Sequence, residues 1–398
     1  MQLFPRALRF GELDQVFPIV LRLLRFFRAW GSRRRLFGLY GFFAVHFSVR
    51  LLPLIVYLDT SDMQTLIRHL GEIVFVGMLY PVFVVYVWKI PKLIQLVEIL
   101  DRAFAKFCQD DQPKEFREEI VKTNKFVRNI CRFYFVYTGA NIPVYIVAPI
   151  LLTFWKYLRW NDPNEPFYFD FPNELPLLNH LNMWHYVICE VLIAPVFFCS
   201  AIFLALKSML YYSLLQYVSL MFKLVLKRIQ LLDKSLSHRR RRQLNRQVDA
   251  VVKHHYLALK CAAILEELIS PILLAQFLGC VIVWCMLIFY MTMSIGDFGA
   301  LTTLILCEIL AFEMLAFSFF GSELTHVSSS VATEIYNFHW YDAPLAIQRK
   351  VLLISVRSQR IVGVTAFKFY YVTIEQFGKA VQTTYSFYLV MKKLFEGQ

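Results

Sequence analysis

The chain has 398 residues, of which 58% are hydrophobic and only 18% are charged, and its formal net charge is +13. A soluble globular chain is about half apolar and a quarter charged, so the excess apolar surface requires lipid as its solvent. The composition therefore excludes an ordinary soluble domain and predicts an all-α membrane protein, because helices satisfy their own backbone groups in lipid.

The N-terminal segment 1–35 is basic and lacks an apolar run that ends in small residues, so a cleavable signal peptide is not expected. Within it, Arg22, Arg25 and Arg28 recur every three residues among Leu, Ile and Phe. This spacing predicts an amphipathic helix over 13–30. Such a helix could lie on the inner leaflet or pack on the cytoplasmic ends of the bundle.

Seven apolar segments follow, and each is a candidate transmembrane helix of about 20 residues. We predict them at 36–58, 73–88, 133–155, 186–206, 268–293, 298–320 and 369–391. The second is short and contains Pro81, whereas the seventh is the least hydrophobic because it contains Glu375 and Lys379. No internal repeat divides the chain, so we expect one seven-helix membrane domain over 1–398.

The distribution of Lys and Arg predicts the orientation. Most of those outside the predicted spans lie in 1–35, 89–128, 212–262 and 321–364, and few lie in the alternate loops. The positive-inside rule then places the N-terminus in the cytoplasm and the C-terminus outside the cell. The run Arg239 to Arg242 belongs to a cytoplasmic loop in this arrangement, so nucleic acid is not expected as a partner, whereas membrane lipid is. The external loop 156–183 contains four prolines and is expected to cap the bundle.

Sequence motifs for catalysis are absent: the chain has no Gly-rich phosphate loop, no GxSxG and no HExxH. It also has no CxxC pair, so we expect neither an enzyme nor a metal site, and no cofactor. Charges inside spans are costly and usually face protein or water. We expect buried pairs or interfacial positions for such residues, which are Arg50, Glu190, Glu308, Glu313, Glu375 and Lys379.

The last span carries a polar stripe. Thr373, Gln376, Thr383 and Ser386 share one helical face, which either packs in the bundle or lines water.

The region 321–394 resembles the C-terminal part of insect odorant receptors. The matching residues are Gly321-Ser322-Glu323-Leu324, Val331-Ala332, Tyr336, Trp340-Tyr341, Gln348-Arg349-Lys350, Arg357 to Arg360, Thr365 to Phe369 and Thr383 to Tyr388. Phe367 stands where the family usually has Gly, and Gly363-Val364 replaces another common pair. Thr384-Tyr385 also resembles the gustatory receptors, but Met391-Lys392 departs from their pattern. The second cytoplasmic loop is short, which resembles a ligand-tuned subunit rather than the enlarged co-receptor.

The resemblance implies an odorant-binding subunit of a ligand-gated, non-selective cation channel that assembles as a tetramer with a co-receptor. It implies assembly through the cytoplasmic segments 212–262 and 321–364, a pore lined by the last helix, and no cofactor. It also implies the plasma membrane of sensory neuron dendrites as the location. The alternatives are a metabotropic seven-helix receptor, although its N-terminus would lie outside, and a gustatory-type channel.

The resemblance places a small volatile ligand in the outer half of the bundle, between spans two, three, four and six. Counted from the outer ends of these spans, the candidate ligand-binding residues are Phe75, Met78, Leu79, Asn141, Tyr145, Ile193, Phe197 and Leu306. Phe75, Met78 and Leu79 share a helical face by spacing, and so do Asn141 and Tyr145. Ordinary bundle packing is the alternative for each residue.

The resemblance places the channel gate in the last turns of the final helix. The candidate pore residues are Thr383, Ser386, Val390, Lys393 and Leu394. An apolar ring at Val390 could gate by dewetting. Lys393 would repel cations unless the co-receptor subunits supply most of the ring or the side chain extends outward to the interface.

Overall fold

The computed structural model describes residues 18–26, 30–31, 41, 44–45, 47–48, 63–109, 112–160, 167, 181–233, 241–293 and 298–396. The described part is helical, apart from short connections and one isolated β-bridge between Thr365 and Tyr371. Most of the predicted span 36–58, including Arg50, and most of the predicted external loop 156–183 lie outside the described residues.

The helices are much longer than the predicted spans. They are α1 (Pro18–Phe26), α3 (Met63–Phe107), α4 (Lys114–Arg159), α5 (Met183–Asp233), α6 (Arg241–Met293), α7 (Phe298–Asn337), α8 (Leu345–Ser358) and α9 (Ile374–Glu396), with a 3-10 turn at Trp340–Asp342. At 1.5 Å per residue, a helix of 51 residues such as α5 measures about 77 Å. The hydrocarbon core is only about 30 Å thick, so a large part of each long helix projects beyond it.

Five helices among the described residues are long and apolar enough to cross a membrane. They are the helices at Ile73–Phe107, Lys114–Arg159, Met183–Leu232, Leu244–Thr292 and Thr303–Asn337. The protein is thus an all-helical membrane protein. Prolines occur inside α3, α4, α5 and α6, where each removes one backbone hydrogen bond from its helix.

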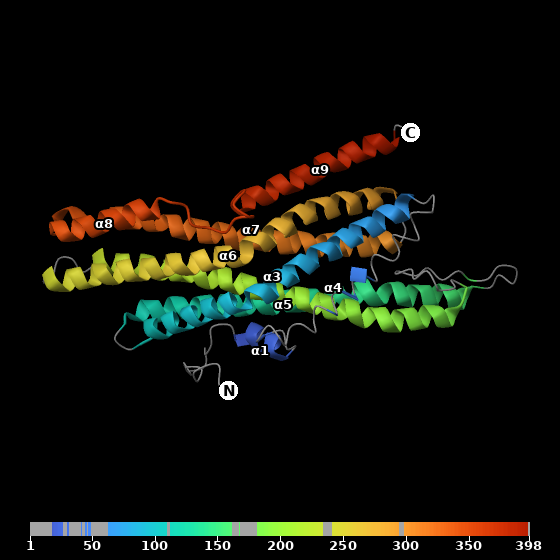
Figure 1. The fold of residues 1–398 in the computed structure, drawn as a ribbon, viewed down its shortest axis with the longest axis horizontal. Coiled ribbons are helices and arrows are strands. Elements are labelled where there is room, and N and C mark those ends of the chain that lie inside the picture. The colour runs from blue at the N-terminus through green and yellow to red at the C-terminus, as the bar shows by residue number, and fades with distance from the viewer. Residues whose placement is uncertain are drawn as a thin grey trace.

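The long helices run side by side along the molecule, with α8 at one end and the C-terminal end of α9 at the other (Figure 1). The middle of α5 is the centre of the core, because residues from Met209 to Phe222 are buried on every face of the helix. A helix that is apolar all round belongs in a protein interior. α1 packs on α4 and α5, with Val20 and Leu24 buried, so it contacts the bundle.

The helix in the last predicted span, 369–391, starts later than predicted. Residues 369–373 are not helical: the chain turns at Phe367 and Lys368, which have φ of 49° and 66°, and α9 begins at Ile374. Glu266 on α6 accepts hydrogen bonds from the backbone N–H of Thr365 at 2.8 Å and from the Thr365 hydroxyl. The carboxylate thus gives a backbone N–H of this non-helical turn a hydrogen-bond partner, so the turn is stabilised and α9 begins only after it.

Residues 321–324 of α7, which match the odorant receptor pattern, hold the turn before α9 against α7. At Gly321 an added Cβ would collide with the carbonyl oxygen of Val372, so only glycine permits this approach. The Ser322 hydroxyl accepts a hydrogen bond from the N–H of Ile374 at 2.9 Å, at the start of α9. Glu323 lies 2.6 Å from the ammonium group of Lys223 on α5. The block therefore joins α5, α7 and α9.

Candidate ligand-binding cavity

An apolar cavity of about 80 Å³ lies between α3, α4, α5 and α7. The lining side chains follow helical spacing on every wall: Phe75 and Leu79 are four residues apart on α3, and Leu306 and Ile309 are three apart on α7. The rest of the lining comes from α4 (Tyr134, Thr138, Ile142, Tyr145 and Ile146) and from α5 (Phe197, Ser200, Ala201, Leu204 and Ala205).

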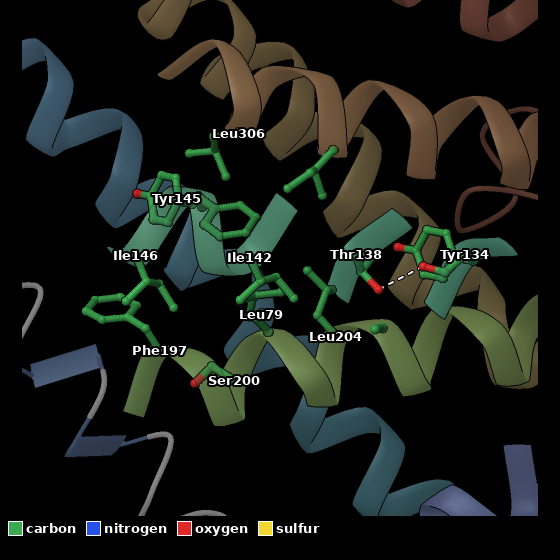
Figure 2. A pocket seen from close by; sticks show the side chains of 14 residues that line it. Leu79, Tyr134, Thr138, Ile142, Tyr145, Ile146, Phe197, Ser200, Leu204 and Leu306 are labelled. Atoms are coloured by element: carbon green, nitrogen blue, oxygen red, sulfur yellow. Dashed lines mark hydrogen bonds between the residues drawn. The ribbon is translucent and has the colours of Figure 1, made fainter. Parts of the chain in front are cut away.

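The cavity is elongated along the helices. Tyr145, Ile146 and Phe197 gather at one end of it, whereas Tyr134 and Thr138 lie at the other (Figure 2). The Thr138 hydroxyl donates a hydrogen bond of 2.8 Å to the backbone carbonyl of Tyr134 within α4. The polar groups at the wall are therefore a few hydroxyls set among hydrocarbon. Such a surface suits a small, largely apolar ligand with at most a few hydrogen-bonding groups.

Five of the eight predicted ligand-binding residues line this cavity: Phe75, Leu79, Tyr145, Phe197 and Leu306. Met78 is not among the lining residues, because it packs against α6 at Gly279. Asn141 is also not among them, although Ile142 is. The side chain of Ile193 lies outside the described residues.

The cavity extends further toward the N-terminal end of α4 and the C-terminal end of α5 than predicted. Its lining begins at Tyr134, near the cytoplasmic end of the predicted span 133–155, and reaches Ala205 in the predicted span 186–206. Sequence reasoning missed these deeper positions because it counted from the outer span ends. The run of small residues Ser200, Ala201 and Ala205 on one face of α5 was the available signal.

A buried ion pair lies near Tyr134, at one end of the cavity. The ammonium group of Lys207 lies 2.9 Å from a carboxylate oxygen of Glu313, and both side chains are almost completely buried. Ser208 donates to the same oxygen, and the Tyr212 hydroxyl donates to the Glu313 carbonyl at 3.3 Å. Glu313 therefore has the buried partner expected for an intramembrane charge.

The other charges of the predicted spans differ in their partners and burial. Glu308 accepts a hydrogen bond of 3.1 Å from the Tyr137 hydroxyl, and Glu190 is buried. Glu375 and Lys379 form an exposed pair at 2.7 Å within α9. These two charges satisfy each other locally and do not fix how α9 contacts its surroundings.

The predicted pore face of α9 is turned away from the rest of this chain. Thr383, Ser386 and Lys393 are exposed, and Val390 is 55% exposed. The Leu394 side chain lies outside the described residues. The opposite face packs on α6: Thr384 is buried, and Met391 contacts Cys285 with sulfur atoms 3.3 Å apart. The predicted pore face is thus free of α6 in the single chain.

Comparison with solved structures shows the fold. The chain is similar to the insect olfactory receptor OR5 from Machilis hrabei, solved in complex with eugenol. The TM-score is 0.71 at 10% sequence identity, and the match covers 91% of this chain and 90% of that one. A second structure of the same receptor matches with a TM-score of 0.70.

Curated relatives match over a shorter stretch. The odorant receptor Or2 of Anopheles gambiae is 25% identical over 148 residues, which are 36% of this chain and 38% of that protein. The putative odorant receptor 85e of Drosophila melanogaster is 28% identical over 156 residues, 38% of this chain and 32% of that protein. The odorant receptor coreceptor of Anopheles gambiae is 24% identical over 145 residues, or 36% and 30%.

A family model covers far more of the sequence. The model described as 7tm odorant receptor matches residues 62–385, which include all four helices around the cavity and most of α9. This is a receptor family and not an enzyme family. The chain therefore belongs to the insect odorant receptor family.

Proposed function

We propose that this chain is the odorant-binding subunit of a ligand-gated, non-selective cation channel that it forms with a co-receptor subunit. The apolar cavity between α3, α4, α5 and α7 carries this proposal. Family membership supports it, and so does the similarity of fold to a receptor solved with eugenol, a small organic compound.

The size of the cavity indicates how a ligand would act. A cavity of about 150 Å³ can hold benzene, and this one measures only about 80 Å³. An odorant of ten or more heavy atoms therefore requires the lining side chains to move. A ligand shifts a conformational equilibrium only by its difference in affinity for the two states. An odorant that fits only the expanded cavity satisfies this condition.

We further propose seven membrane spans, with the N-terminus in the cytoplasm and the C-terminus outside. The bias of Lys and Arg toward alternate loops supports this orientation. Epitope tags at the two termini, read on cells with intact membranes, test it. We expect only the C-terminal tag to be accessible, and an accessible N-terminal tag would contradict the proposed orientation.

The co-receptor requirement is tested by expression with and without that subunit. We expect odorant-evoked current in cells that express both chains, and little from this chain alone. Excised patches without nucleotide distinguish a channel from a metabotropic receptor, because a channel still opens there. Loss of the response on excision would favour the metabotropic alternative, and robust current from the single chain would exclude an obligate co-receptor.

The exposed face of α9 is the proposed pore lining. Cysteine at Val390 or Lys393 in the complex should react with a charged thiol reagent applied outside, and the reaction should alter the odorant-evoked current. We expect Lys393 to lower divalent permeability relative to a neutral residue, because its charge repels cations. Reaction at both positions without any change in current or ion selectivity would remove this face from the conduction path. We place the proposed channel in the plasma membrane of sensory neuron dendrites.

A further inference from the structure

A second, polar cavity of about 480 Å³ lies far from the odorant cavity, where the cytoplasmic parts of several helices meet. It lies between the C-terminal end of α3, the connection to α4, the C-terminal part of α5 and the N-terminal part of α6. Its lining residues are Ala103, Lys106, Phe107, Gln112, Arg228, Arg246, Asp249, Ala250, Lys253, His254, Tyr256 and Leu257.

The charge of this cavity is strongly positive. Lys106, Arg228, Arg246 and Lys253 contribute four cations from three different helices. Asp249 is the acidic residue of the lining, and its carboxylate lies 2.6 Å from the ammonium group of Lys350 on α8. The carboxylate is thus already paired, and the four cations dominate the field in the cavity.

Two of the lining residues are held in place by the fold. An Nη of Arg228 donates to Oε1 of Gln112 at 2.8 Å, and the guanidinium group lies over the ring of Phe116 at 4.9 Å. The ring of His254 packs against Phe107 at 4.5 Å, and its Nδ1 is buried without a hydrogen-bond partner in the described chain. A pre-positioned guanidinium group and a buried ring nitrogen are features of a formed site.

His254 is also surrounded by positive charge, from Arg228 and Lys106. This residue precedes the apolar part of α6 at 268–293 and lies outside the membrane. Burial, together with the nearby charges of Arg228 and Lys106, lowers the pKa of His254 to about 3. The imidazole is therefore neutral. It adds no positive charge of its own, but its ring nitrogens can hydrogen-bond to a bound anion.

We propose that this cavity binds a soluble anion carrying two or more phosphate groups. Arg and Lys are the side chains that bind phosphate oxygens, and a guanidinium group can do so with two parallel hydrogen bonds. The volume falls within the range of small-molecule sites, which is about 300–1,000 Å³. A single inorganic phosphate would reach only part of a cavity of this size.

Distance from the bilayer favours a soluble anion over a lipid headgroup. Phe107 follows Trp88, the last residue of the predicted second span, by 19 residues of continuous helix, and this corresponds to about 28 Å of rise. The attraction of a membrane surface falls off within about one Debye length, roughly 8 Å at physiological salt. The cavity therefore lies mainly in the cytoplasm and beyond the reach of the headgroup layer.

Binding to the purified full-length chain in detergent tests this proposal by isothermal titration calorimetry. The probes are inositol hexakisphosphate, ATP and inorganic phosphate. To test whether the anion is instead a lipid headgroup, the same chain is reconstituted in vesicles that contain phosphatidylinositol 4,5-bisphosphate. The test variant is Lys106→Gln with Lys253→Gln. The matched control is Lys125→Gln with Lys260→Gln, which removes two exposed lysines from α4 and α6 that do not line the cavity.

We expect saturable binding of a polyphosphate probe at one site per chain, with inorganic phosphate much weaker. The test variant should bind at least about tenfold more weakly, because two nearby charges are lost. The control variant should bind within about twofold of the original chain, because exposed charges that do not line the cavity are screened by salt. Equal weakening in both double variants, or no saturable binding of either polyphosphate, would overturn the proposal. Binding confined to the lipid vesicles would overturn the assignment to a soluble anion.

Discussion

The apolar cavity and a neighbouring set of polar side chains share helices α5 and α7 but differ in chemistry. The cavity is lined by hydrocarbon and a few hydroxyls. Elsewhere, polar and charged side chains join α5 to α7 and α6 to the turn before α9. We call this set the polar layer, and it comprises Lys207, Ser208, Gln216, Lys223, Glu266, Ser270, Glu313, Glu323 and Thr365.

α5 passes through both regions and shows the contrast within one helix. At the cavity it presents small residues such as Ser200 and Ala201, which leave space. From Met209 to Phe222 it is buried on every side. Weakly directional apolar contacts tolerate rearrangement better than a buried polar network that must stay satisfied. The comparison therefore indicates a deformable ligand site on a rigid base, and substitutions in the two regions should have different effects.

The largest effect is expected in the polar layer at Glu313. Replacing it in Glu313→Ala leaves the ammonium group of Lys207 buried without its partner, which typically costs about 3–5 kcal/mol of unfolding free energy. Thermal unfolding of the purified chain measures the loss. The double variant Glu313→Ala with Lys207→Met should recover much of it, since no charge remains buried. A double variant as unstable as the single one would contradict this account of the pair.

A smaller loss is expected at the turn before α9. Glu266→Ala removes the carboxylate that accepts two hydrogen bonds from Thr365, one of them 2.8 Å long. Hydrogen bonds to charged groups contribute about 1.5–3 kcal/mol. The neighbouring Glu267 pairs with Lys92 at half-exposed positions, so Glu267→Ala should cost less than about 1 kcal/mol. Equal losses of unfolding free energy in the two variants would show that the bonds to Thr365 are unimportant.

In the cavity, the expected change is in ligand potency. Tyr145→Ala removes an aromatic wall and should raise the half-effective odorant concentration about tenfold, equivalent to about 1.4 kcal/mol. Phe135→Ala, at an exposed position on the same helix, is the matched control and should leave potency unchanged. Dose–response curves in cells with the co-receptor measure both. A Tyr145 variant with normal potency and normal surface expression would remove this residue from the ligand site.

The smallest effect is a gain in stability at the turn. Phe367 adopts φ of 49°, which costs an L-residue about 1–2 kcal/mol, and its side chain is mostly exposed. Phe367→Gly should therefore raise the unfolding free energy by up to about 1 kcal/mol. Phe369→Gly, two residues on and without positive φ, should lower it. A loss of stability in both variants would show that the Phe367 side chain has contacts that outweigh the strain.

The sequence predicts the cavity walls well where helical spacing is unambiguous. Phe75 and Leu79 are four residues apart and share a wall. Phe197 likewise shares the α5 wall, and Leu306 the α7 wall, with lining residues about one turn away on the same helix. Met78 is three residues from Phe75, but it faces α6 instead. Spacings of three and four residues fall on opposite sides of a stripe, and only the packing of a neighbouring helix decides which side faces the cavity.

Other features could not be predicted because they depend on contacts between distant parts of the chain. Lys207 and Glu313 are 106 residues apart, and Lys207 lies just beyond the end of a predicted span. The late start of α9 depends on Glu266, which lies about 100 residues before Thr365. The positive φ at Phe367 agrees with the glycine that the family usually has there, because positive φ favours glycine, but no special backbone conformation was predicted from it.

The central claim is that the apolar cavity binds the odorant, and filling it is the most direct test. Ala201 lines the cavity, so Ala201→Phe places an aromatic ring in its volume of about 80 Å³. Ala140→Phe, at an exposed position on α4 that does not line the cavity, is the control. With an odorant identified by screening the unaltered complex, we expect Ala201→Phe to abolish the response at normal surface expression, whereas Ala140→Phe keeps it. An unchanged dose–response curve in Ala201→Phe would show that the odorant binds elsewhere.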